Sequence, residues 1–393
     1  MIKPFKVNVS NSILKDINAR VKNFPWHEMP KDGGWNYGTN LDYMKEISNY
    51  WTTKFNWKKH EEEINKFSNF KTDIDGIEIH FIQEKGSGSN PQPLLITHGW
   101  PGSIIESLHI IKKLAHPEEF GGKEEDAFDV IVPSLPGFGF SGKPSKPLGP
   151  RKMAEILNNL MTENLGYKNY IAQGGDWGGT ISNWIAYDHS KNCKGIHINF
   201  LSMRLPDGPQ NIEEEKWQEK FTKGQEMEEG YRIQQATRPQ TLSYGMMDSP
   251  VGIAAWIIEK MYSWSDLKDN NIESVYSKDS LLANIMVYVI TKTFNTATWI
   301  YYGRREEGGR LFPSNFKKIK IPTAAAIFPA EMSEWPPRSY VERIFNIKQW
   351  TEMPAGGHFA ALEKPDLLVN DVRKFLRSLR FNPYDESGGQ SNH

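Results

Sequence analysis

The residues most able to do chemistry lie in a glycine-rich stretch, QGGDWGG at residues 173–179. Within it, Asp176 takes the place of serine in G-x-S-x-G, the spacing of a nucleophile elbow. A carboxylate has a reference pKa of about 3.9, so it needs no base to become a nucleophile. Its attack on a saturated carbon would give an alkyl-enzyme ester. Alternatively, Asp176 only caps a helix, and the pentapeptide alone supports both interpretations equally.

Hydrolysis of such an ester requires a base and a residue that orients the base. The candidate base is His358, in a glycine-rich stretch after the last predicted strand. The candidate orienting acid is Glu331, which follows a strand ending in Phe-Pro, with Glu334 as its competitor. The resulting chain order, Asp then Glu then His, is the order of α/β-hydrolases.

An oxyanion hole is the third requirement, and the HGWPGS loop at residues 98–103 follows a predicted strand. We expect the backbone N–H groups of Trp100 and Trp177 to form it. No His or Cys spacing typical of a metal site occurs, so we expect neither a metal nor an organic cofactor. Residues 137–142 match G-x-G-x-x-G, but two prolines follow within five residues and argue against a dinucleotide site.

The composition limits the partners and the compartment. The 393 residues include 47 Lys and Arg against 48 Asp and Glu, a balance that predicts no attraction to nucleic acid or anionic membranes. Cys193 is the only cysteine, which excludes an intrachain disulfide. The N-terminus lacks the apolar core of a signal peptide, and no apolar run approaches the roughly 20 residues that span a bilayer. We therefore expect a soluble, cytoplasmic protein without a membrane anchor.

The elements that must position these residues begin with a helical segment. Residues 1–70 carry apolar side chains at three- and four-residue spacing without strand alternation, and Asn11 or Ser12 is the expected cap of the first helix. Residues 70–82 then alternate around the Asp-Gly dipeptide at 75–76, which predicts a β-hairpin.

Short apolar runs then alternate with helical stretches, which predicts an α/β fold with a mostly parallel, doubly wound sheet. The expected strands lie near residues 93–98, 128–133, 170–173, 196–200, 321–329 and 349–353. A helical, aromatic segment separates the fourth strand from the fifth and predicts an inserted cap over the strand ends. The expected division is an N-terminal helical extension (1–70), a first core segment (71–205), the cap (206–318), a second core segment (319–385) and a disordered polar tail (386–393).

The chain resembles the microsomal and juvenile-hormone epoxide hydrolase family, together with its soluble fungal and bacterial relatives. The resemblance runs nearly end to end. Its most specific stretches are THGWPGS (97–103), QGGDWG (173–178), GYRIQQATRPQTL (230–242), DSPVGIAAWIIEK (248–260) and GGHFAALE (356–363). It implies an α/β-hydrolase fold with that family's N-terminal extension.

The resemblance also implies the reaction, in which an epoxide and water give a vicinal diol. Tyr231 matches the first of two cap tyrosines that hold and protonate the epoxide oxygen. Tyr301 is our choice for the second, with Tyr302 as the alternative. Phenols with a reference pKa of about 10 can donate without being ionised at neutral pH. Glu331 matches the acid position of the family.

Two other functions fit parts of the pattern. A haloalkane dehalogenase also uses an Asp nucleophile and a His base, and the indoles of Trp100 and Trp177 can bind halide. A tyrosine pair at the pocket would favour the epoxide instead. A non-catalytic binding protein on this scaffold would lack a triad member, and none is missing here. The expected partners are a small, mostly apolar epoxide and water, and a homodimer is one assembly compatible with the sequence.

Overall fold

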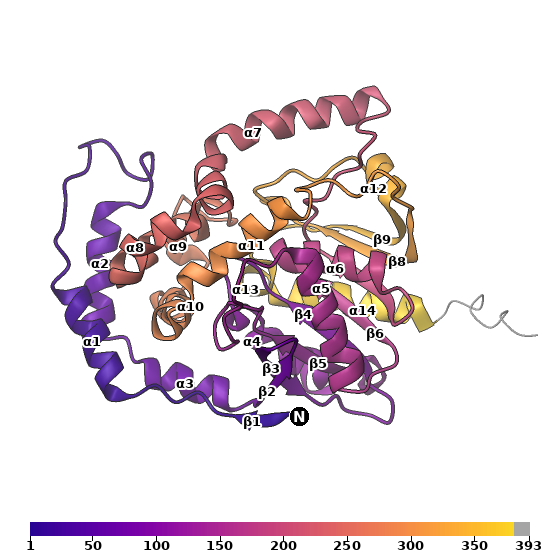
Figure 1. The fold of residues 1–393 in the computed structure, drawn as a ribbon, viewed down its shortest axis with the longest axis horizontal. Helices are drawn as coiled ribbons and strands as arrows, with labels where there is room; N and C mark the ends of the chain where they lie inside the picture. Colours follow the sequence, from indigo (N-terminus) through magenta and orange to yellow (C-terminus); the bar gives the residue numbers. More distant parts are fainter. Residues whose placement is uncertain (381–393) are drawn as a thin grey trace, which may run out of the picture.

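The computed structural model describes residues 1–380, so the predicted tail at 386–393 lies outside the described residues. A nine-stranded sheet crosses the molecule in the order β1-β2-β3-β5-β4-β6-β7-β8-β9 (Figure 1). Its strands are β1 (Lys3–Phe5), β2 (Ser68–Ile74), β3 (Ile77–Glu84), β4 (Gln92–Thr97), β5 (Phe128–Pro133), β6 (Tyr170–Gly174), β7 (Cys193–Ile198), β8 (Ile319–Ile327) and β9 (Phe345–Glu352).

The sheet is mostly parallel, as predicted. Strands β4 to β9 pair in parallel, whereas β1, β2 and β3 form an antiparallel edge that joins β5. The predicted hairpin is the β2–β3 pair, which turns at Asp75 and Gly76 with φ values of 54° and 78°. Every residue of β5 and β6 is buried, which is typical of parallel strands covered on both faces.

Helices flank this sheet on both sides. Helices α5 (Pro150–Asn159) and α6 (Asp176–Asp188) pack together, and α4 (Leu108–Ala115) packs with α14 (Pro365–Arg380). The α/β-hydrolase fold is therefore confirmed, with a mixed sheet and its central strands fully covered.

The first 70 residues differ from the prediction in two details. They form helices α1 (Asn11–Lys22), α2 (Leu41–Thr53) and α3 (Trp57–Asn65), but β1 also pairs with β2 at the sheet edge. Three residues are too few to show strand alternation. The predicted cap was also wrong, because Ser10 is the N-cap of α1 and its hydroxyl accepts from Ile13 N–H at 3.4 Å.

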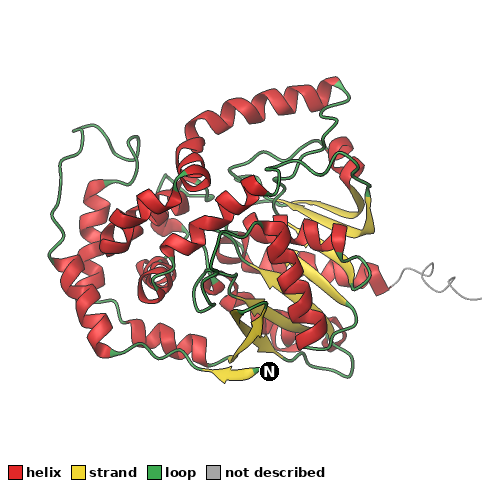
Figure 2. Cartoon of the chain, viewed as in Figure 1, coloured by secondary structure: helices red, strands yellow, loops and turns green. Residues whose placement is uncertain are grey.

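Five α-helices and one short 3-10 helix (Ile272–Ser274) lie between β7 and β8, in the segment predicted to be a cap. Figure 2 shows helices as the main component of the molecule outside the sheet. The α-helices of this segment are α7 (Ile212–Thr237), α8 (Pro239–Asp248), α9 (Pro250–Ser263), α10 (Lys278–Thr291) and α11 (Phe294–Glu306). Helices α1 and α2 pack against α9 and α10, and the Trp35 and Tyr262 rings stack there at 3.8 Å. Among the described residues, none of the helices combines the length and the apolarity needed to cross a bilayer.

Candidate active site

Asp176 occupies a tight turn between β6 and α6. Its φ of 47° is uncommon for a residue with a side chain and is typical of a strained functional turn. The turn closes because glycine flanks it: a Cβ on Gly178 would lie 1.8 Å from the Thr97 carbonyl oxygen. Gly175, not Asp176, is the N-cap of α6, and the Asp176 carboxylate accepts instead from Trp100 N–H. The geometry therefore matches the predicted elbow and not the helix-cap alternative.

We predict that Gly178→Ala destabilises the protein by at least about 2 kcal/mol, because the added methyl would overlap main-chain atoms that cannot move independently. Urea denaturation measures the difference. The matched control is Gly224→Ala in α7, where an added Cβ meets nothing within 4 Å. This control is expected to raise the stability of the helix by about 0.5–1 kcal/mol. Equal stability of the two variants would contradict the close packing of the elbow.

Three predicted residues come together at this turn. His358 Nε2 lies 3.3 Å from Asp176 Oδ2, and His358 Nδ1 lies 2.8 Å from Glu331 Oε1. The side chains of His358 and Glu331 are each 2% exposed, so water competes little for these contacts. The competing acid, Glu334, instead pairs with Lys220 at 2.9 Å. The geometry thus favours Glu331 as the partner of the imidazole.

The loop that carries His358 is held by hydrogen bonds that its backbone N–H groups donate. Glu363 accepts the N–H groups of Gly357 and Phe359 at 2.9 Å each. The N–H group of His358 donates to the Trp264 carbonyl at 2.9 Å. These bonds hold the imidazole from both sides of the loop, so its position does not depend on its contacts with carboxylates alone.

Charge determines the protonation of His358 in the resting protein. Burial lowers its pKa, but the carboxylates of Glu331 and Asp176 raise it more, so that it stands well above the usual value. The imidazole is therefore an imidazolium held between two carboxylates. Loss of either negative charge would make its proton easier to remove.

The predicted oxyanion loop contacts Asp176 directly. Trp100 N–H donates to Asp176 Oδ1 at 2.7 Å. Glycine is required at position 99, because a Cβ there would lie 2.1 Å from the same oxygen. Trp177 lies in the first turn of α6, but within residues 1–380 no hydrogen bond joins its backbone N–H to the Asp176 carboxylate. Of the two predicted oxyanion-hole donors, the backbone N–H of Trp100 is thus the one that contacts the Asp176 carboxylate.

The two chosen tyrosines reach the site from different helices. Tyr231 on α7 stacks on Trp100 with 5.3 Å between ring centroids, and Tyr301 on α11 meets Trp177 at 4.7 Å. Their own rings lie 5.8 Å apart at 83°. Burial, the largest cause, raises the pKa of both phenols, which keeps them protonated hydrogen-bond donors. Tyr302, by contrast, is partly exposed.

Both tyrosines and Asp176 line a small cavity of about 30 Å³, which we call the catalytic cavity. Three arginines that the sequence analysis did not single out share its wall: Arg232, Arg304 and Arg310. Arg232 is far from the other two in the sequence, and no motif groups the three.

Glu106 is a further residue that the sequence analysis missed. It lines a second small cavity, of about 30 Å³, together with Asp176, His358 and Asn199. Burial raises the pKa of Glu106 to about 8, while the charge of His358 opposes the rise. A carboxyl with this pKa is mostly protonated at neutral pH, so it can donate a hydrogen bond beside the imidazole.

The chain is similar to known proteins in sequence and in fold. Residues 2–107 match the family model of the epoxide hydrolase N terminus, and residues 92–221 match that of the alpha/beta hydrolase fold. A putative epoxide hydrolase of Stigmatella aurantiaca is 38% identical over 96% of this chain and 86% of its own length. Epoxide hydrolase 1 of Sus scrofa is 36% identical over 95% of this chain and 88% of its own.

Solved structures agree with these relatives. The epoxide hydrolase of Aspergillus niger superposes with a TM-score of 0.84 and 28% identity, covering 96% of this chain and 97% of its own. The juvenile hormone epoxide hydrolase of Bombyx mori gives a TM-score of 0.86 at 28% identity, covering 97% and 95%. The similarity to both extends over the N-terminal helices as well as the sheet.

Proposed function

The chain belongs to the epoxide hydrolases, and we propose that it opens its substrate by forming an alkyl-enzyme ester on Asp176. The observation that carries this proposal is the placement of one carboxylate in a strained elbow, 3.3 Å from a buried imidazole, on a cavity shared with two protonated phenols. The family relationship supports the reaction, and the geometry supports these residue roles.

In the first step, Asp176 attacks a ring carbon and the bond from that carbon to the epoxide oxygen breaks. An alkoxide is a poor leaving group, so it needs a proton as it forms. Tyr231 and Tyr301 hold the oxygen and one of them transfers its proton. Their raised pKa values keep that proton available at neutral pH.

In the second step, His358 passes the proton that it carries in the resting protein to the tyrosinate. The neutral imidazole then removes a proton from water, and the water oxygen attacks the ester carbonyl of Asp176. Glu331 orients the imidazole through Nδ1. The N–H groups of Trp100 and Trp177 are the proposed donors to the oxyanion. The bond between the carbonyl carbon and the diol oxygen then breaks, and that oxygen takes the proton of the new Asp176 carboxyl group. The diol leaves, with Asp176 again a carboxylate and His358 again an imidazolium.

A single turnover in 18-O water tests the proposal. With styrene oxide as substrate, water attacks the ester carbonyl, so the label should appear in the Asp176 carboxylate and not in the first molecule of diol. Mass spectrometry of the peptide that contains Asp176 measures it. Label in the diol with an unlabelled peptide would show direct attack of water on the epoxide and would exclude the ester.

We predict that Tyr231→Phe and Tyr301→Phe each slow ester formation by about 10- to 100-fold, because each removes one donor to the departing oxygen. Stopped-flow fluorescence of the neighbouring tryptophans under single-turnover conditions measures this step. Tyr302→Phe is the matched control, since Tyr302 follows Tyr301 on the same helix but is partly exposed. A large loss in Tyr302→Phe with normal rates in Tyr301→Phe would reverse the assignment.

One observation also fits dehalogenation. The indole nitrogen of Trp100 is buried and has no hydrogen-bond partner within the described part of the chain, as a halide-binding donor would be. The two tyrosines on the same cavity, and the epoxide hydrolase relatives, favour the epoxide. Incubation with 1-chlorohexane should release no chloride at enzyme concentrations that fully convert an epoxide.

A cytoplasmic location and a homodimer stay proposals. The single cysteine, Cys193, is buried and fits a reducing compartment. Cell fractionation and analytical ultracentrifugation test the two.

A further inference from the structure

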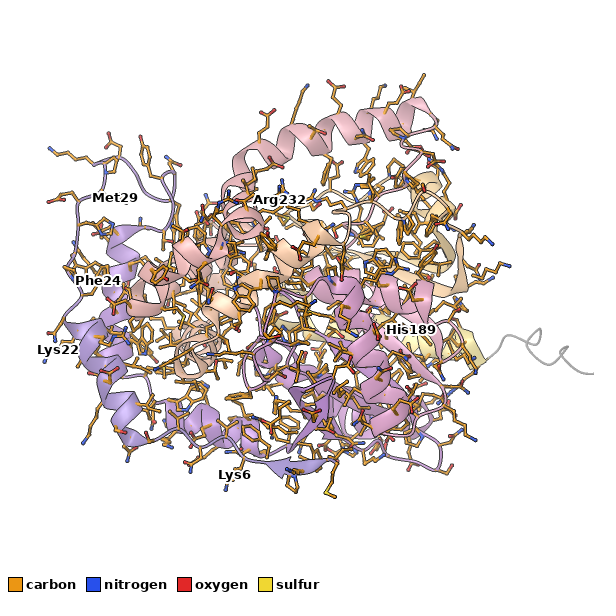
Figure 3. The ribbon with its side chains drawn as sticks, viewed as in Figure 1. Lys6, Lys22, Phe24, Met29, His189 and Arg232 are labelled. Atoms are coloured by element: carbon orange, nitrogen blue, oxygen red, sulfur yellow. The ribbon has the colours of Figure 1, made fainter. Side chains whose placement is uncertain are left out.

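Two small cavities border Asp176, and their linings differ. Side chains fill most of the space between the ribbons (Figure 3), so these cavities are enclosed spaces directly beside the nucleophile. The catalytic cavity is lined by Tyr231 and Tyr301, the proposed donors to the epoxide oxygen. The second cavity is lined by Glu106 and His358 and by neither tyrosine. Its wall therefore carries the proposed base of the hydrolytic step.

The second cavity has the size and the polarity of a water site. Its volume of about 30 Å³ exceeds the roughly 10–15 Å³ that one water molecule needs, and it is too small for an epoxide. A buried water needs about two to four polar partners. The wall offers the carboxyl groups of Glu106 and Asp176, the imidazole of His358 and the amide of Asn199. A water molecule in this cavity would lie beside the future ester.

His358 Nε2 is one partner available to this water. The nitrogen is buried, and among the described residues it has no hydrogen-bond partner. Asp176 Oδ2 lies 3.3 Å away, but this ion pair is too poorly aligned for a hydrogen bond. Because Nδ1 already contacts Glu331 at 2.8 Å, Nε2 is the ring nitrogen that can bond to water.

Glu106 is a second partner, and the fold fixes its carboxyl group. Glu106 lies in a short 3-10 helix, Ile104–Ser107, directly after the oxyanion loop. Its carboxyl group lies against Gly102, where a Cβ would be only 1.2 Å from Glu106 Oε1. Burial raises the pKa of Glu106 to about 8, so the group is mostly protonated at neutral pH. A protonated carboxyl group still accepts a hydrogen bond, and it places no negative charge beside the oxyanion that forms.

We infer that Glu106 positions the water that hydrolyses the ester, by accepting a hydrogen bond from it while His358 Nε2 removes its other hydrogen as a proton. The inference rests on the proposed function and adds a residue to its second step. The water oxygen keeps a lone pair with which it attacks the Asp176 carbonyl carbon. The hydrogen that faced Glu106 stays on this oxygen, which becomes part of the Asp176 carboxyl group. Glu106 itself neither gains nor loses a proton.

Glu106→Met tests the inference, because it removes both oxygens at nearly constant side-chain volume. We expect ester hydrolysis to slow about 10- to 100-fold, the scale of one buried hydrogen bond lost. Ester formation should stay within about threefold of the wild type, since that step uses no water. Single-turnover stopped-flow fluorescence with styrene oxide measures the two rates separately. Normal hydrolysis, or an equal slowing of both steps, would overturn the inference.

Glu106→Gln is the conservative variant. An amide has the shape of a protonated carboxyl group and keeps an accepting oxygen, so both rates should stay within about threefold of the wild type. A Gln variant as slow in hydrolysis as the Met variant would contradict positioning through a neutral hydrogen bond. The matched control is Glu119→Met, in the 3-10 helix Pro117–Phe120, where the side chain is exposed and both rates should equal those of the wild type.

Gly102→Ala displaces the carboxyl group without removing it, because the added Cβ fits only if Glu106 turns away. We expect this change to slow ester hydrolysis at least about tenfold in the wild-type background. In the Glu106→Ala background, where no carboxyl group is left to displace, it should slow hydrolysis by less than about twofold. Equal slowing in both backgrounds would show that Gly102 acts through the loop alone and would contradict the inference.

The inference and the proposed function fail in different ways. Wild-type protein that converts styrene oxide without forming an ester on Asp176 would count against the proposed function. An ester that forms in Glu106→Met and is hydrolysed at the wild-type rate would overturn the inference alone.

Discussion

Replacing Asp176 by asparagine is expected to lower epoxide hydrolysis by at least about 10,000-fold, the scale of losing a catalytic nucleophile. An amide oxygen is a far weaker nucleophile than a carboxylate, and no other group takes its place in the elbow. The change is nearly isosteric. An Asn side chain can still accept the 2.7 Å hydrogen bond from Trp100 N–H, and Asn tolerates the φ of 47°. The variant should therefore fold, and its loss of activity should be chemical.

Initial rates of diol formation, together with thermal denaturation, measure this effect. The matched control is Asp188→Asn, at the other end of α6, where an exposed carboxylate pairs with Arg151 at 2.7 Å. Its rate should stay within about twofold of the wild type, since exposed ion pairs contribute little. Intact-mass measurement excludes deamidation of the new asparagine. More than a few per cent of wild-type activity in undeamidated Asp176→Asn would exclude Asp176 as the nucleophile.

The sequence was most informative where local chemistry restricts the backbone. The elbow could be predicted because G-x-D-x-G is short and its glycines have no substitute: a Cβ on Gly174 would lie 2.3 Å from the Gly178 carbonyl carbon. The parallel strands could be predicted because burial on both faces requires continuous apolar runs. His358 followed from its place after the last strand.

Other features depend on packing, which the sequence does not encode locally. Glu331 and Glu334 are three residues apart in one loop, and only the folded chain turns one toward His358 and the other toward Lys220. Arg232 meets Arg304 and Arg310 at the catalytic cavity because α7 and α11 pack together, although it is far from both in the sequence. The elevated pKa of Glu106 comes mainly from burial, which a single sequence does not reveal.

The chemistry of His358 follows from a change in charge during the reaction. In the resting protein, Asp176 is one of the two carboxylates that raise its pKa above the usual value. Ester formation makes Asp176 neutral and removes that contribution. The pKa of His358 should then fall, which frees Nε2 to accept a proton from water. The base thus becomes available only after the ester exists.

His358→Gln should therefore form the ester normally and hydrolyse it at least about 1,000-fold more slowly, because the general base is gone while the nucleophile and both tyrosines remain. Intact-mass spectrometry should show the protein carrying one added substrate molecule. The wild-type hydrolysis rate should rise with pH as His358 loses its proton, and the variant should lose this dependence.

The matched control for that variant is His109→Gln. His109 is an exposed histidine in α4, so this variant should hydrolyse its ester at the wild-type rate.

Glu331→Gln should give an intermediate result. It keeps an acceptor 2.8 Å from Nδ1 but removes the second charge that raises the pKa of His358. Its hydrolysis rate should reach a plateau at lower pH than that of the wild type, with a lower maximum because the imidazole is a weaker base. An unchanged pH profile in Glu331→Gln would show that its carboxylate does not tune the imidazole. Turnover of the ester at the normal rate in His358→Gln would assign the base to another residue, and Glu106, which lines a cavity with Asp176 and His358, would be the next to test.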